Sequence, residues 1–75
     1  MDIKKRIGLR IKELRLEKKI SQEALANIAE IDRTYMTSVE NGRRNIAVVN
    51  LEKIIKALDS DFGQFFNNKS FNELH

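Results

Sequence analysis

Apolar residues recur three or four positions apart along this chain, which is the spacing of one face of a helix. Near the N-terminus this stripe lies among charged residues and predicts a helix over about residues 2–18. Its members are Ile3, Ile7, Ile11 and Leu14. A second stripe predicts a helix over about Val48–Leu58. Its members are Val48, Leu51, Ile54, Ile55 and Leu58. No segment alternates as a strand does, so the pattern predicts an all-α fold.

Two short helices are predicted between these longer ones. Ser21 is a good N-cap for a helix over Gln22–Ala29, and Asp32 is a good N-cap for a helix over Arg33–Glu40. Asn41-Gly42 then ends the second of them. An apolar residue before each cap and another inside each helix have the spacing of a hydrophobic staple. These pairs are Ile20 with Leu25 and Ile31 with Met36.

A fifth helix is predicted after Asp61, which is placed to cap it. Phe62, Phe65 and Phe66 would share one face of this helix. The tail from Asn67 is polar except for Phe71 and Leu74, which favours fraying. The expected architecture is therefore a single five-helix domain over residues 1–75.

The composition excludes several classes of protein. The chain has 75 residues and no Cys, so it offers neither disulfides nor a thiolate metal site. The longest apolar run, Ile46–Val49, is too short to span a membrane, and the charged start lacks a signal core. The single histidine, His75, is the last residue and is interpreted as a solvated terminus. We expect a cytoplasmic protein that is not an enzyme and needs no metal, cofactor or small-molecule ligand.

Charge is unevenly distributed along the chain. Residues 1–19 carry eight lysines and arginines against three acidic residues, a balance of +5, while residues 59–75 have a balance of −2. A basic first segment is typical of a nucleic-acid surface. The alternative is that the first helix simply has a solvated charged face.

The two short helices outline a helix-turn-helix. Arg33, Thr34, Thr37 and Ser38 lie at the start and on the predicted outer face of the second short helix. Short polar side chains beside one arginine suit the edges of bases in a DNA major groove. These four residues are the candidates for reading bases. The alternatives are an arginine that contacts only phosphate, and a threonine and serine that are polar filler.

Three segments together resemble the phage repressor and Cro class of helix-turn-helix proteins. They are Ser21-Gln22-Glu23-Ala24-Leu25-Ala26, Asp32-Arg33-Thr34-Tyr35 and Val39-Glu40-Asn41-Gly42. The resemblance extends over roughly residues 6–66. Within that class, Asp-Arg-Thr-Tyr followed by Arg44-Asn45 is similar to the controller proteins of restriction-modification systems.

The resemblance implies roles for further residues. Those that match positions contacting the DNA backbone are Gln22, Tyr35, Asn41, Arg43, Arg44 and Asn45. A helix N-terminus at Gln22 and two arginines beside a glycine also suit phosphates on physical grounds. A charged surface turn is the alternative for the loop, and an ordinary first helical residue is the alternative for Gln22. Tyr35 has two interpretations: it packs against the first short helix and bonds a phosphate through its hydroxyl, or it reorients between DNA sequences. Arg15 and Glu40 match an inward ion pair between the first and third helices, the alternative being two unpaired surface charges.

The chain departs from the class at two turns. Lys19 and Glu30 stand where glycine is common. If both adopt left-handed backbone geometry, each costs about 1 kcal/mol or more. Ala47 is also a weak cap for the helix that follows it.

Dimerisation is expected from the phenylalanines at the C-terminal end, within residues 59–75. Four phenylalanines in ten residues exceed what a short terminal helix needs for anchoring. We expect Phe62 and Phe65 mainly to close the monomer core, and Phe66 to help form an isologous interface. The alternative is that all four fold over the core.

The sequence therefore predicts a homodimeric, sequence-specific transcription regulator that binds pseudo-palindromic operator DNA. Control of a restriction-modification operon is the most specific role, and activation and repression are both implied by the resemblance. A phage-type or chromosomal repressor is the nearest alternative. An alternative of another class is a protein-interaction module such as an antitoxin.

Overall fold

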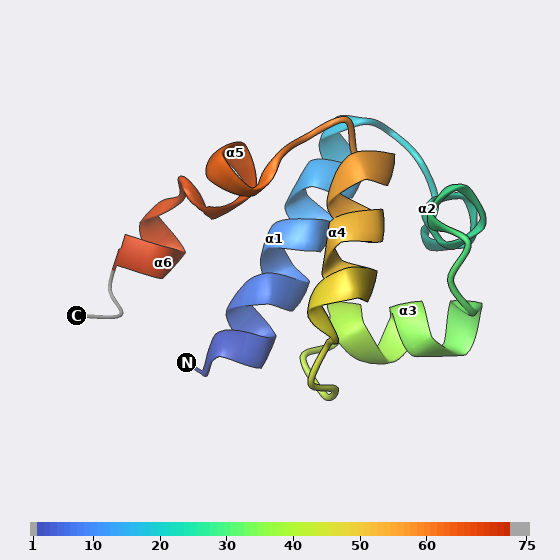
Figure 1. The fold of residues 1–75 in the computed structure, drawn as a ribbon, viewed down its shortest axis with the longest axis horizontal. Coiled ribbons are helices and arrows are strands. Elements are labelled where there is room, and N and C mark those ends of the chain that lie inside the picture. The colour runs from blue at the N-terminus through green and yellow to red at the C-terminus, as the bar shows by residue number, and fades with distance from the viewer. Residues whose placement is uncertain (1, 73–75) are drawn as a thin grey trace.

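A computed structural model describes residues 2–72, and every regular element in that range is a helix. The helices are α1 (Ile3–Glu17), α2 (Gln22–Ala29), α3 (Arg33–Glu40), α4 (Val48–Ala57), α5 (Phe62–Phe66) and α6 (Lys69–Asn72) (Figure 1). The predicted all-α fold is confirmed. None of these helices is long and apolar enough to cross a membrane.

The prediction of five helices is wrong, because the tail forms the extra helix α6. Asn68 starts it by accepting hydrogen bonds from the Ser70 backbone N–H at 3.0 Å and the Ser70 hydroxyl at 2.7 Å. Phe71 anchors it, since its side chain is buried. The expectations for Leu74 and His75 lie outside the described residues.

Local capping chemistry sets the bounds of α2 and α3, which agree with the predicted ranges. The Ser21 hydroxyl accepts a hydrogen bond from the Ala24 backbone N–H at 3.0 Å, and the Asp32 carboxylate accepts one from the Tyr35 backbone N–H at 3.1 Å. Such bonds satisfy amide groups that have no partner in the first helical turn. Asp2 caps α1 in the same way, and its bond from the Lys5 N–H lowers the pKa of its carboxyl.

Three helix ends have left-handed backbone geometry without glycine. The φ angles are 58° at Lys19, 57° at Glu30 and 56° at Asp59. The first two are the turns where glycine was missing from the sequence. At Glu30 the strain is accompanied by a hydrogen bond from the Ile31 N–H back to the Ala26 carbonyl at 2.9 Å, which closes the end of α2.

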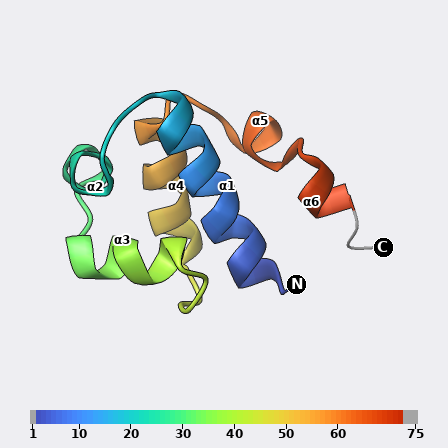
Figure 2. The same cartoon turned by 180° about the vertical axis from the view of Figure 1, so that it is seen from behind.

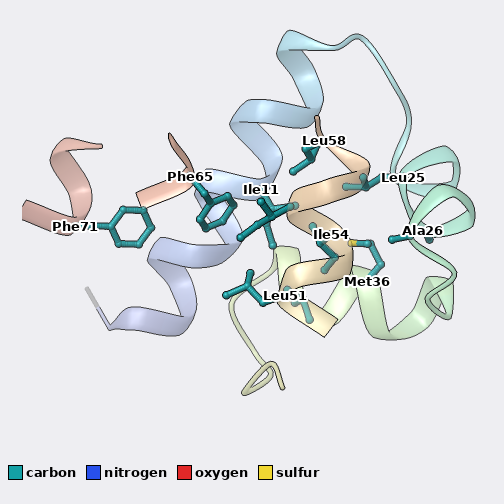
Figure 3. Packing of buried hydrophobic residues seen from close by; sticks show 12 residues of the cluster. Ile11, Leu25, Ala26, Met36, Leu51, Ile54, Leu58, Phe65 and Phe71 are labelled. Atoms are coloured by element: carbon teal, nitrogen blue, oxygen red, sulfur yellow. The ribbon is translucent and has the colours of Figure 1, made fainter. Parts of the chain in front are cut away.

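The core forms where α1 and α4 run side by side and α2 and α3 cover one flank (Figures 1 and 2). Ile11 lies near its centre, between Phe65 on one side and Ile54 of α4 on the other (Figure 3). The buried apolar residues are Ile11, Leu25, Ala26, Ala29, Met36, Val39, Leu51, Ile54, Ile55, Leu58, Phe65 and Phe71. The core thus joins α5 and α6 to the helix-turn-helix.

Two members of the predicted apolar stripes are exposed. Val48 is 73% exposed and Ile3 is 43% exposed, which is contrary to their predicted core positions. Each is the first residue of its helix. Helical side chains lean toward the N-terminus, so these two point past the end of the packed layer.

Of the two phenylalanines predicted to close the core, only one does so. Phe65 is fully buried, but Phe62 is 40% exposed and does not close the core. Phe66 is partly buried because Phe71 covers it, with the two ring centroids 4.8 Å apart in an edge-to-face arrangement. The sixth helix, which the sequence did not indicate, is therefore what changes the environment of Phe66.

Candidate nucleic-acid interface

The candidate base-reading residues lie together on α3, the second helix of the helix-turn-helix. Arg33 and Thr34 are exposed at its first turn, while Thr37 and Ser38 are partly buried one turn later. Met36 and Val39, on the opposite face, are buried in the core. The structure thus presents the polar face of a short helix that is held firmly from behind.

Residues of α2 hold two of these side chains in place. The Arg33 guanidinium donates to the Glu23 carboxylate at 2.9 Å, and both side chains are mostly exposed. The Thr37 hydroxyl donates to the Gln22 side-chain oxygen at 2.6 Å. Glu23 was not identified from the sequence, because nothing in a spacing of ten residues marks two side chains as neighbours. The first turn of α2 therefore helps to fix the orientation of the reading side chains.

Tyr35 links α3 to the loop that follows it. Its hydroxyl accepts hydrogen bonds from the Asn50 side chain at 3.2 Å and the Ala47 backbone N–H at 3.4 Å. The Arg44 guanidinium lies over the Tyr35 ring, 4.9 Å from the centroid. Asn50 was another residue that the sequence did not identify. Tyr35 therefore positions the loop.

The remaining candidates for backbone contact surround the end of α3. Asn41, Arg43, Arg44 and Asn45 are all exposed in this loop. Gly42 turns the chain inside it with a φ of +71°, and a side chain there would meet Lys5. The loop is thus a cluster of polar and cationic side chains directly after the reading helix.

Arg15 and Glu40 form a bidentate ion pair between α1 and α3. The Arg15 Nε and Nη2 atoms donate to the two Glu40 carboxylate oxygens at 2.8 and 3.1 Å. A third bond joins Arg15 Nη1 to the Ile20 carbonyl at 2.9 Å. The side chains are only 12% and 2% exposed. The pair therefore fixes α1 against the end of α3 rather than offering a charge to solvent.

Half of the basic residues in the first segment are engaged within the protein. Arg6 donates to the Ser70 carbonyl at 2.8 Å, and Arg10 donates to the Phe65 and Gln64 carbonyls at 2.7 and 2.9 Å. Arg15 is bound to Glu40, and Lys18 pairs with Asp59. The charge balance of this segment therefore overstates the cations available to DNA. Those that remain are Lys4, Lys5, Lys12 and Lys19.

Within residues 2–72, no group of three or more histidine or acidic side chains is placed to hold a metal ion. Apart from the Glu23, Asp32 and Glu40 carboxylates, which are engaged in hydrogen bonds within the protein, the polar side chains of α3 and the loop after it carry guanidinium, amide and hydroxyl groups. These are donors suited to base edges and phosphate oxygens.

The chain matches known proteins over most of its length. The helix-turn-helix family matches residues 11–65. Control protein C.MunI from a Mycoplasma species is 47% identical over 68 residues, covering 89% of this chain and 92% of that protein. The crystal structure of the restriction-modification controller protein C.AhdI from Aeromonas hydrophila has a TM-score of 0.80 at 41% identity. It covers 84% of this chain and 96% of that one.

A structure of a related protein on DNA matches as well. The controller protein C.Esp1396I, solved as a tetramer in complex with its natural 35 base-pair operator, has a TM-score of 0.83 at 36% identity. The match covers 88% of this chain and 87% of that one. The family resemblance seen in the sequence is therefore confirmed. The chain belongs to the helix-turn-helix family of transcriptional regulators, as a relative of the controller proteins of restriction-modification systems.

Proposed function

We propose that this protein is the controller of a restriction-modification operon and binds operator DNA as a homodimer. The observation that carries the proposal is the polar face of α3, exposed at Arg33 and Thr34 and fixed by the core behind it. The similarity to controller proteins over most of both chains supports the same function.

The reading step follows from the donors on α3. Arg33 is placed at the N-terminal end of the helix, where residues of a recognition helix meet base edges in the major groove. Its guanidinium can donate two bonds to guanine O6 and N7. Thr34, Thr37 and Ser38 add short hydroxyl groups that fit beside it, and the Thr34 methyl group suits a thymine methyl. This face therefore accounts for sequence preference.

Contacts to phosphates fix the helix in the groove. Gln22 lies at the start of α2, and the exposed loop offers Asn41, Arg43, Arg44 and Asn45. Such contacts contribute affinity without reading sequence. The Arg44 guanidinium lies over the Tyr35 ring, and this contact helps to orient the loop.

The proposal includes a homodimer because one short helix spans only a few base pairs. Two-fold dimers place their reading helices about 34 Å apart, in successive turns of the major groove. Phe62 supplies exposed aromatic surface for this interface, beside the partly buried Phe66 at a centroid separation of 6.4 Å. Phe65 is buried in the monomer, so it does not contact the partner and supports the interface only by packing against Phe66.

The proposed role involves no catalysis and no cofactor, and it places the protein in the cytoplasm, where operator DNA is found. The proposal is tested by two variants measured on two DNAs. Arg33→Ala should cost about 1–3 kcal/mol on the selected operator and leave binding to random duplex nearly unchanged. Arg43→Ala should weaken both to a similar degree. Equal losses on both DNAs for both variants would contradict the assignment.

The dimer has its own test. Phe62→Ala should raise the dissociation constant of the dimer tenfold or more in sedimentation equilibrium, since aromatic anchors contribute about 2 kcal/mol or more to an interface. Ile28→Ala is the matched control, because Ile28 is also exposed, at 58%, but lies on α2. An unchanged dissociation constant for Phe62→Ala would refute this interface.

A further inference from the structure

A groove of about 360 Å³ lies between α1 and the helix-turn-helix. Lys5 and Lys12 of α1 line one side of it, and Gln22 of α2 and Asn41 after α3 line the other. α1 and the end of α3 are neighbours in both views (Figures 1 and 2). The groove therefore begins where two of the proposed phosphate contacts lie.

The charges in the groove are unequal. Among its described lining residues the only acidic one is Glu40, and Arg15 already neutralises that carboxylate. Lys5 and Lys12 are exposed, and neither has an ion-pair partner within residues 2–72. They are seven residues apart on one helix face, about 10 Å along the axis. The groove thus presents two separated ammonium groups, and the paired Arg15 and Glu40 in its lining add no net charge.

We propose that this groove is an additional binding site for the DNA backbone, where Lys5 and Lys12 neutralise phosphates beyond those reached by Gln22 and Asn41. This inference rests on the proposed function, because it extends the same DNA complex. It selects Lys5 and Lys12 from the basic first segment, which the sequence indicated only as a whole, and gives these two residues a defined place beside the reading face.

Continuity with the reading face favours a polynucleotide as the occupant. Gln22 lines the groove and is also hydrogen-bonded to Thr37 of α3, so a strand that meets α3 lies at the edge of the groove. Two lysines spread along a helix suit a row of phosphates better than one small anion, because each ammonium acts as a separate point charge. Exposed lysine side chains also retain the freedom to follow a backbone without reading bases.

The experiment is a salt titration of DNA binding by the double variant Lys5→Gln and Lys12→Gln. Each phosphate neutralised contributes about −0.9 to the slope of the logarithm of the association constant against the logarithm of the salt concentration. The variant should therefore make the slope less steep by about 1.8, both on a selected operator and on random duplex. If the affinities of the variant and the wild-type protein are equal at 1 M salt, this corresponds to an affinity loss of about 60-fold at 0.1 M salt.

Two controls separate this effect from a change of fold and from the loss of a lysine charge elsewhere on the protein. Lys5→Arg with Lys12→Arg keeps both charges and should retain the wild-type slope. Lys56→Gln removes one charge from the far end of α4, where Lys56 borders a hollow that also contains Glu30, and should leave the slope unchanged. Thermal melts of all variants should coincide within a few degrees, because these side chains are exposed.

Each outcome is decisive. A less steep slope confined to the glutamine double variant supports the groove site. An unchanged slope, or an equal change with Lys56→Gln, overturns it, even if wild-type protein still selects an operator and Arg33→Ala still loses preference for it. Failure of both the operator selection and the Arg33→Ala effect would instead refute the proposed function.

Discussion

Removing Glu40 should destabilise the fold far more than removing an ordinary surface charge. Its side chain is 2% exposed and accepts two hydrogen bonds from Arg15, whose own side chain is 12% exposed. Glu40→Ala would leave the Arg15 guanidinium buried with only its bond to the Ile20 carbonyl. Leaving one member of a buried pair without its partner costs about 3–5 kcal/mol.

That loss is large for a domain of this size. At the usual stability per residue, 75 residues give a free energy of unfolding of about 4–11 kcal/mol. Since 1 kcal/mol shifts the melting temperature of a small domain by about 4–8 °C, the variant should melt at least about 12 °C lower. DNA binding should fall as well, because the pair fixes α1 against the end of α3.

Urea unfolding measures this free energy directly, and Glu23→Ala is the matched control. Glu23 also pairs with an arginine, but that pair is 60% and 66% exposed. Its loss should cost about 1 kcal/mol at most. The Glu40 effect should also persist in 1 M salt, because buried pairs are screened little. If Glu40→Ala changed stability no more than Glu23→Ala, the interpretation of Glu40 as a structural anchor would be wrong.

Three further predictions concern local geometry. Gly8→Ala should destabilise the protein by about 1–3 kcal/mol in urea unfolding, because the added Cβ would lie 2.5 Å from the Glu40 carbonyl oxygen. Alanine in place of glycine usually stabilises a helix by about 1 kcal/mol, and such a gain here would contradict this close contact. Glu30→Gly should stabilise the protein by up to about 1 kcal/mol by relieving left-handed strain, and a lower melting temperature would refute that reason. Tyr35→Phe should cost about 0.5–1.5 kcal/mol and speed hydrogen exchange at the Ala47 amide; unchanged exchange would show that the hydroxyl does not anchor the loop.

The sequence was sufficient where structure depends on neighbouring residues. The bounds of α2 and α3 were predicted because Ser21 and Asp32 each satisfy an amide group three residues away. The left-handed turns at Lys19 and Glu30 followed from matching their positions to a family that often has glycine there. The polar face of α3 followed from helical spacing alone.

The sequence was insufficient where structure depends on distant partners. Arg6 and Arg10 contributed to an apparent DNA-binding charge, but they bind carbonyl groups of residues more than 50 positions later. The partly buried environment of Phe66 could not be predicted without α6, whose Phe71 covers it. Glu23 was missed for the same reason, since its contact with Arg33 depends on how α2 and α3 cross.

Selection of random duplex DNA by the purified protein, at moderate salt, followed by sequencing of what is retained, tests the central claim most directly. A homodimer that reads DNA through α3 should enrich a pseudo-palindrome whose half-sites each contain a guanine, and Arg33→Ala should lose that guanine from the motif. Retention of all sequences alike, in a manner that salt abolishes, would contradict sequence-specific control and favour a protein partner instead.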